Sequence, residues 1–256
     1  MKIYRKNNRF PANLSSCRPQ DVTAERFAND RRTFIKKGIL LGTVAGISGI
    51  GLLSGCKEET EEEVTPSEDL MREHGVLNRI LLIYDTCSGY LQNNLPFDLK
   101  ILHNSAQIIR TFIEDYHEKL EQDYLFPRFE QANQFVDLIK VLRAQHQAGR
   151  VLTDRILYLA NMKPTSNTED NQKLSKLLND FSGMYRPHEA REDTVLFPAI
   201  RKIVSKDEYY ALGEDFERRE HELFGEDGFD SMVEKVAALE KQLGIYELSQ
   251  FTPTIV

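Results

Sequence analysis

The sequence predicts an all-α protein, an antiparallel four-helix bundle followed by a C-terminal helical extension. Three observations predict this fold. Apolar residues recur every three or four positions over long stretches, which is the spacing of the buried stripe of an amphipathic helix. None of these stretches shows the strict alternation of a half-buried strand. Helix-capping and helix-breaking residues separate the stretches, and short connections are typical of antiparallel neighbours in a bundle.

Residues 1–55 are expected to form an export signal outside the fold. They hold ten Lys/Arg and three Asp/Glu, a net charge of +7. Arg31 and Arg32 precede the 15-residue apolar run Ile39–Leu53, which is shorter than the roughly 20 residues of a spanning helix and suits the core of a signal peptide. The arginine pair resembles the twin-arginine signal of bacteria. An uncleaved N-terminal membrane anchor is the alternative.

The segment around Cys56 predicts how the mature protein is held. Leu53-Ser54-Gly55-Cys56 resembles a bacterial lipobox, whose cysteine is lipidated. We therefore expect a membrane-anchored lipoprotein that faces the periplasm or the cell exterior. Residues 56–65 contain the run Glu58–Glu63, where like charges predict a solvated acidic linker.

The charge of the remaining chain excludes one class of partner. Residues 56–256 hold 23 basic and 37 acidic residues, a net charge of −14. Nucleic-acid binding needs a basic face to neutralise phosphates. We therefore expect no nucleic-acid partner.

The bundle is expected to occupy residues 66–204. Thr65-Pro66-Ser67-Glu68 is a capping box with proline at the first helical position, which predicts the start of the first helix. Breaks are predicted near Asn93–Pro96, around Pro127 and at Lys163–Thr168. The apolar stripes between these breaks run over Leu70–Tyr84, Leu102–Tyr124, Ile139–Ile156 and Leu177–Ala199.

Residues 205–256 are expected to pack outside the bundle. Ser205–Glu208 has the spacing of a capping box, as does Ser166–Glu169 in the bundle. A helical segment is predicted over 206–243, with a turn at Gly225–Gly228. An extended tail is predicted from Gln250 onward.

A histidine occupies a core position in each of the four stripes. Burial of an imidazole is unfavourable unless its nitrogens find partners, so four such residues require an explanation. Two of the stripes also carry a glutamate one helical turn later. The two His-x-x-x-Glu segments are offset by 71 residues and the two lone histidines by 72. The residues are His74, His117, Glu121, His146, His188 and Glu192.

This internal duplication predicts that four imidazoles and two carboxylates converge in the bundle core. Two buried carboxylates without compensating charge are strongly destabilising, and bound cations remove that problem. Imidazole and carboxylate donors without thiolate suit iron, manganese or zinc. Bundle cores are known locations for such di-metal sites.

The order His…HxxxE…His…HxxxE resembles the hemerythrin-like, or HHE cation-binding, family over roughly residues 66–200. The resemblance implies the hemerythrin bundle and a carboxylate-bridged, non-haem centre of two iron ions. It implies that the four histidines are terminal ligands and that Glu121 and Glu192 are bridges. The sequence departs from oxygen-carrying hemerythrin at Arg150, where that subfamily has a further histidine.

The departure at Arg150 leaves a more open iron or requires another ligand. Glu118 is the first candidate, because some members of the family use the carboxylate after the second-helix histidine. Glu189 is its mirror position, and His221 is a further auxiliary candidate.

The function expected from these residues is binding or sensing of dioxygen, or of nitric oxide or peroxide. The alternative is storage or buffering of iron or another metal without oxygen chemistry. We expect a metal- or oxygen-binding protein rather than an enzyme. The sequence does not define the oligomeric state.

Overall fold

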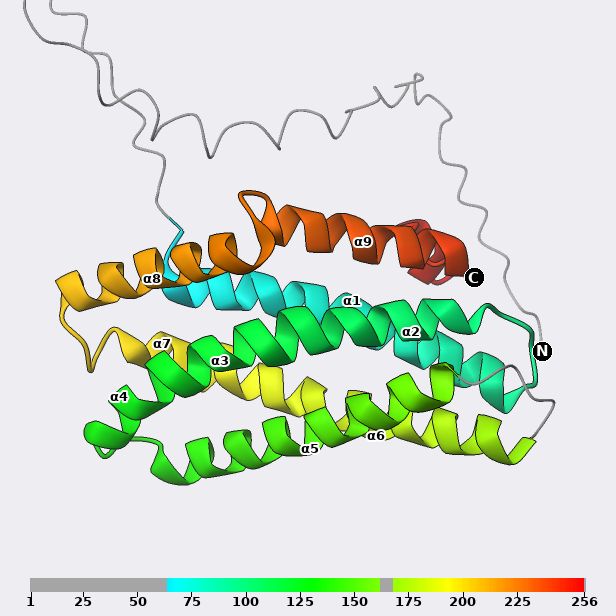
Figure 1. The fold of residues 1–256 in the computed structure, drawn as a ribbon, viewed down its shortest axis with the longest axis horizontal. Coiled ribbons are helices and arrows are strands. Elements are labelled where there is room, and N and C mark those ends of the chain that lie inside the picture. Colours follow the sequence, from blue (N-terminus) through cyan, green and yellow to red (C-terminus); the bar gives the residue numbers. More distant parts are fainter. Residues whose placement is uncertain (1–63, 162–167, 256) are drawn as a thin grey trace, which may run out of the picture. The chain divides into compact units, whose positions relative to one another are not determined.

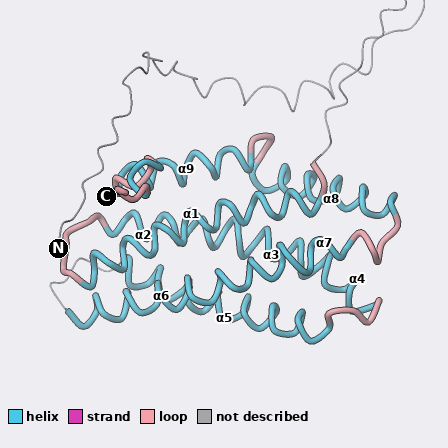
Figure 2. Tube along the Cα trace, turned by 180° about the vertical axis from the view of Figure 1, so that it is seen from behind, coloured by secondary structure: helices cyan, strands magenta, loops and turns pink. Residues whose placement is uncertain are grey.

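The computed structural model describes residues 64–161 and 168–255, and it contains helices but no strand within these ranges (Figure 2). Four long helices run antiparallel, and two further helices lie against them (Figure 1). The all-α prediction is therefore confirmed. The expected export signal with Arg31 and Arg32, and the lipidation site Cys56, lie outside the described residues.

The first helix begins where the capping box predicts. Helix α1 spans Pro66–Gln92, and Thr65 is its N-cap. The Thr65 side chain accepts from the Glu68 N–H, and the Glu68 carboxylate accepts from the Thr65 N–H at 3.0 Å. Asn93 is the C-cap of the helix, and Asn94 adopts a φ of 51°. This is the predicted break.

The second long helix is continuous but changes its hydrogen-bond pattern along its length. Its consecutive segments are α2 (Leu99–Ile108), η3 (Ile109–His117), α3 (Glu118–Leu120), η4 (Glu121–Leu125) and α4 (Phe126–Gln131). The segments η3 and η4 are π-helical. The predicted break around Pro127 is wrong, because the helix continues to Gln131.

A wide turn lets the helix pass through Pro127. The Phe126 N–H bonds the carbonyl of Glu121, five residues earlier, as expected in a π turn. Proline lacks an N–H and its ring clashes with the carbonyl four residues earlier in a regular α-helix, so a wider turn just before it relieves the conflict. The break comes instead near Asn133 and Phe135, which have φ values of 52° and 54°.

The third long helix is a regular α-helix, and the fourth repeats the plan of the second. Helix α5 spans Val136–Ala160. Helix α6 (Thr168–Arg191), η5 (Glu192–Leu196) and α7 (Phe197–Ile200) then form one continuous helix. A π turn again precedes a proline, since the Phe197 N–H bonds the carbonyl of Glu192 just before Pro198. Ser166, the first residue of the predicted capping box, lies outside the described residues.

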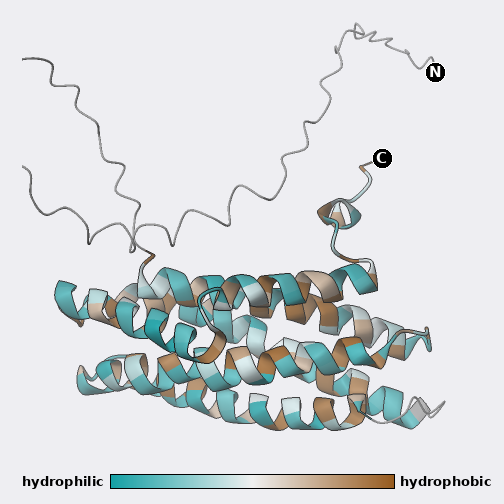
Figure 3. Ribbon diagram, turned by 45° about the horizontal axis from the view of Figure 1, so that its top comes forward, coloured by the Kyte–Doolittle hydropathy of each residue, from teal (hydrophilic) through white to brown (hydrophobic). Residues whose placement is uncertain are grey.

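One apolar core joins the four helices. Helix α6 packs against α1 and α5, and α5 packs against α2. Hydrophobic and hydrophilic residues are interspersed along every helix (Figure 3), as expected for amphipathic helices. The largest fully buried side chains include Tyr84, Phe112, Tyr116, Phe181 and Tyr185.

The C-terminal extension packs on the outside of the bundle. Helix α8 (Lys206–Phe224) begins at the N-cap Ser205, and α9 (Gly228–Leu243) follows the predicted glycine turn. Both helices pack against α1. The tail differs slightly from expectation, because a 3₁₀ turn (η6, Leu248–Phe251) precedes the extended end. Among the described residues, no helix combines the length and apolar character needed to cross a membrane.

Candidate metal centre

The four core histidines come from the four long helices and are buried. His74 lies in α1, His117 ends η3, His146 lies in α5 and His188 lies in α6. Their exposed fractions are 4% or less. Each histidine falls on the apolar stripe of its helix, so the period that buries the neighbouring leucines also buries the imidazole.

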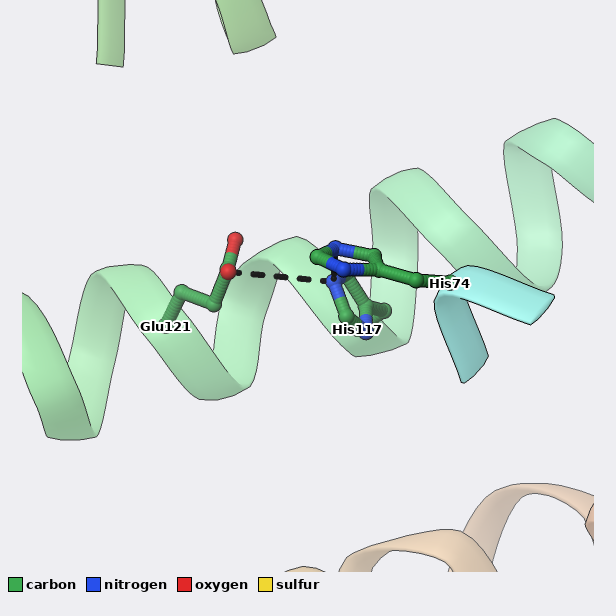
Figure 4. Close-up of side chains that lie close together, drawn as sticks. All are labelled: His74, His117 and Glu121. Atoms are coloured by element: carbon green, nitrogen blue, oxygen red, sulfur yellow. Dashed lines mark hydrogen bonds and ion pairs between the residues drawn. The ribbon is translucent and has the colours of Figure 1, made fainter. Parts of the chain in front are cut away.

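The imidazoles meet in two pairs. The Nε2 atoms of His74 and His117 lie 3.0 Å apart, and those of His146 and His188 lie 3.1 Å apart. In Figure 4, the ring of His74 from α1 meets that of His117 from the neighbouring helix, and the Glu121 carboxylate points toward them. Each pair therefore joins one lone-histidine helix to one His-x-x-x-Glu helix.

Each glutamate lies between the two pairs. Glu121 places Oε1 3.7 Å from His117 Nε2 and Oε2 3.4 Å from His146 Nε2. Glu192 Oε2 lies 3.0 Å from His188 Nε2 and 3.5 Å from His74 Nε2. A carboxylate that reaches both pairs is in a position to bridge two cations.

The carboxylates of Glu121 and Glu192 are fully buried, and none of their four oxygens has a hydrogen-bond partner of normal geometry among the described residues. Buried polar atoms are almost always partnered in proteins. Burial raises the pKa of both groups well above the usual range, and the neighbouring Glu192 carboxylate adds to the shift of Glu121. Their oxygens are left available for cations.

The imidazoles are held neutral, which is the form that binds metal. Burial lowers the pKa of His74 and of His188 to about 4 and that of His117 to about 3. Burial also lowers the pKa of His146 well below the usual range, and the other imidazoles add to this shift.

Four partners orient the rings from behind. The Nδ1 atom of His74 lies 2.8 Å from Asp193 Oδ1, and that of His117 lies 2.6 Å from Glu73 Oε2. Such contacts fix the ring and direct Nε2 toward a metal. On the other pair, Gln145 Oε1 lies 3.0 Å from His188 Nδ1 and takes the same acceptor position, whereas Gln122 contacts His146 Nδ1 through its Nε2 at 2.8 Å.

Sequence reasoning missed these four orienting residues, although a signal exists. Each is the immediate chain neighbour of one of the six candidate ligands. Such a neighbour contacts a histidine of a different helix, as Glu73 contacts His117. The interhelical register therefore decides which neighbours serve, and the sequence does not show it.

The repeated Leu-Phe-Pro segments close the centre with apolar rings. Phe197 stacks on His74 with ring centroids 5.4 Å apart, and Phe126 stacks on His146 at 5.8 Å. Each phenylalanine directly follows a π turn that begins at Glu192 or Glu121. Such π turns are frequent at functional sites. Here they place a carboxylate and a stacking ring on one side of the helix.

The auxiliary candidates are not brought into the imidazole–carboxylate cluster. The Glu118 carboxylate is buried but accepts from Tyr185 Oη at 2.7 Å and pairs with Arg150 Nη2 at 2.5 Å. Glu189 accepts from the amide of Asn78. His221 is exposed on α8, because it lies outside the four stripes. The structure thus supplies other partners or solvent for all three expected auxiliaries.

Arg150 is part of a network beside the centre. Burial raises the pKa of Glu118 to about 8, although Arg150 and Tyr185 oppose the shift. Tyr185 fits because residue 149 is glycine, where an added Cβ would lie 2.0 Å from Tyr185 Oη. The tyrosine hydroxyl therefore fills the space against Gly149, and Arg150 pairs with Glu118.

This contact predicts a sharp difference between two glycines. Gly149→Ala is expected to destabilise the protein by about 1–3 kcal/mol, because the rigid phenol must move in a packed core. The matched control is Gly183→Ala in α6, where an added Cβ meets nothing within 4 Å and helix propensity gains roughly 0.5–1 kcal/mol. Urea unfolding of both variants checks this, and equal effects would contradict the contact.

Within the described residues, the donors form two groups whose ligand atoms lie within 4.8 Å of one another. One group is His74, His117 and Glu121, and the other is His146, His188 and Glu192. Two imidazoles with a carboxylate make a donor set suited to iron, manganese or zinc. The fold and this site define the class of protein, a helical bundle with a candidate metal centre at its core.

Comparison with known proteins identifies the family. Residues 65–200 match the hemerythrin HHE cation binding domain. Uncharacterized proteins of Mycobacterium tuberculosis and Mycobacterium bovis are 48% identical over 229 residues, covering 84% of this chain and 90% of theirs. No solved structure matches the chain. The chain belongs to the hemerythrin HHE cation-binding family, whose description implies that it binds metal cations.

Proposed function

We propose that the protein binds two iron ions in its core and uses them to bind dioxygen or a related small oxidant. His74 and His117 would hold one ion, and His146 and His188 the other. Glu121 and Glu192 would bridge them. The observation that carries this proposal is the position of the two buried glutamates, each with carboxylate oxygens within 3.7 Å of both imidazole pairs.

The two halves of the centre supply the same protein donors. This supports reaction of the bound ions with a small ligand rather than saturation of their coordination positions by protein donors. Each half supplies two imidazoles, and Arg150 stands where oxygen carriers supply an additional one. Two ferrous ions, when bound, supply two electrons to an oxidant. The chain's own residues keep the imidazoles neutral, contact each ring at Nδ1 and shield two of the rings with phenylalanine.

The expected result with dioxygen distinguishes this function from metal storage. When the reduced, iron-loaded protein is mixed with air-saturated buffer, an absorption band should grow in the near-ultraviolet to visible range. An unchanged spectrum with two irons bound would exclude oxygen chemistry. More than two irons per chain would favour storage or buffering. The zinc-loaded protein is the control, because zinc has no redox chemistry.

We further propose that the protein is exported and anchored through a lipid on Cys56. The support is the sequence of residues 31–56, which lies outside the described part of the structure. The twin-arginine route moves folded proteins, so a centre loaded in the cytoplasm would cross the membrane intact. Recovery of the full-length chain only in the soluble cytoplasmic fraction of its own cell would contradict this proposal.

A further inference from the structure

One helix of the bundle exposes an apolar surface. Helix α5 lies on the side of the bundle away from α8 and α9 (Figure 1), and it packs against α2 and α6. On its outward side, Val141, Val151 and Tyr158 are 53%, 41% and 68% exposed. Ala144 and Ala148 are also exposed on this side. These five residues form the α5 face.

The corresponding surfaces of the other long helices are polar. Among the described residues of the four long helices, every exposed large hydrophobic side chain lies on α5. The exposed positions of the second long helix between residues 104 and 123 are Asn104, Gln107, Thr111, Asp115, Lys119 and Asp123. A contiguous exposed apolar surface of a soluble domain commonly marks an interaction site. The α5 face is therefore a candidate interface.

The α5 face is symmetric about the level of His146. Val141 and Val151 lie five residues before and after that position, and Ala144 and Ala148 lie two residues before and after it. At 3.6 residues per turn, all four project within about 40° of the direction opposite to the His146 side chain, which is buried. A second α5 helix turned by 180° therefore places Val141 opposite the partner's Val151 and Ala144 opposite the partner's Ala148.

Two charged residues extend the same symmetry. Asp137 and Arg155 lie nine residues before and after position 146, and nine residues are two and a half helical turns. Both side chains are exposed, and neither forms an ion pair within the described ranges. Antiparallel packing places Asp137 opposite the partner's Arg155 and Arg155 opposite the partner's Asp137. Parallel packing would bring like charges together, because each residue would meet its own copy.

We propose that the α5 face binds a second copy of this chain, forming an antiparallel two-fold dimer centred at the level of residue 146. Burial of the valines supplies the attraction, and the alanines near the two-fold axis let the helices approach closely. The two opposite-charge pairs fix the direction of packing. This inference goes beyond the proposed function, and it does not depend on metal because the α5 face contains no candidate ligand.

Sedimentation equilibrium of the full-length chain tests the dimer. We expect a monomer–dimer equilibrium in which Val141→Glu raises the dissociation constant by about tenfold or more, because the two-fold axis puts two charges into the contact. Leu223→Glu, on α8 and 45% exposed, is the matched control and should change nothing. Circular dichroism checks folding. A monomer at every concentration, or a dimer that Val141→Glu does not weaken, would overturn the proposal.

A charge exchange tests the antiparallel direction. Asp137→Arg and Arg155→Asp should each weaken self-association by about threefold or more, because each puts like charges opposite each other twice in the dimer. An equimolar mixture of the two variants should associate more tightly than either alone, since every pair then joins opposite charges. Glu234→Arg on α9, an exposed position, is the matched control. A mixture no tighter than the separate variants would refute the antiparallel contact.

A membrane surface is the other occupant that the experiments separate. Flotation with vesicles of phosphatidylcholine and phosphatidylglycerol measures membrane binding of the same full-length chain. We expect Val141→Glu to leave vesicle binding unchanged while it weakens the dimer. Loss of vesicle binding in Val141→Glu, together with a monomeric parent chain in solution, would assign the α5 face to the membrane and overturn the dimer.

Discussion

Replacing Glu121 by glutamine is expected to stabilise the metal-free protein and to destabilise the metal-loaded protein. In the metal-free state, Glu121 is a buried carboxyl whose pKa is raised by burial and by Glu192. Glutamine removes this titratable group, and its amide can donate to the neighbouring Glu192 carboxylate. We expect a gain of about 1–3 kcal/mol in the free energy of unfolding without metal.

With metal, the same substitution removes one of the two proposed bridging ligands. Binding that is restricted to the folded state stabilises it by mass action, so loss of a ligand should cost about 3 kcal/mol or more at saturating metal. Urea unfolding with and without a chelator measures both signs. Glu234→Gln, an exposed position on α9, should change neither value. A Glu121→Gln effect of the same sign in both states would contradict a bridging role.

After chelation, the free energy of unfolding of the metal-free protein is expected to fall as the pH rises from about 6.5 to about 8. Burial raises the pKa of Glu73, Glu118 and Glu189 to about 8. The folded metal-free protein therefore binds more protons than the unfolded chain above the ordinary carboxyl pKa. Its stability falls until the pH passes the folded pKa, by about 1.4 kcal/mol per pH unit for each such group.

The histidines act in the opposite direction but at lower pH. Their folded pKa values lie near 3 to 4, so the unfolded chain binds more protons below its own histidine pKa of about 6.5. Acidification through that window destabilises the fold and partly offsets the carboxyls. Above about pH 6.5 the imidazoles are neutral in both states, and the carboxyl effect acts alone.

Bound cations should remove this pH dependence, because their charge favours ionised carboxylates nearby. The stability difference between loaded and metal-free protein is therefore expected to widen as the pH rises toward about 8. Parallel urea titrations at both ends of the window measure it. Equal free energies of unfolding with and without chelator near the upper end of this pH window would contradict a core whose charged carboxylates depend on bound metal.

The fold was predictable because its signals are local and repeated. Apolar spacing and the capping box at Thr65 predicted α1 to within its first turn. The predicted helix break around Pro127 is wrong for a physical reason. A proline ordinarily ends a helix, whereas the π turn after Glu121 accommodates it. Because Leu-Phe-Pro recurs at Pro198 after a second π turn, the duplication itself is a sequence signal for this exception.

The six candidate ligands could be found from the sequence, but their surroundings could not. The stripe positions of His74 and Glu192 follow from helical periodicity. The ring partners Glu73 and Asp193 depend on interhelical register, and so does the diversion of Glu118 to Tyr185 and Arg150. Glu118, which follows His117 in the chain, was therefore a reasonable candidate ligand from the sequence, but its carboxylate contacts Tyr185 and Arg150 instead.

Metal analysis of the protein purified from its own cells tests the central claim most directly. The proposed di-iron centre, with four imidazoles around two glutamates, predicts two iron ions per chain. Replacement of both bridging residues, in Glu121→Gln with Glu192→Gln, should abolish binding of both ions without unfolding the bundle. Native protein that is fully folded and carries no metal, or a double variant that retains both ions, would contradict the account.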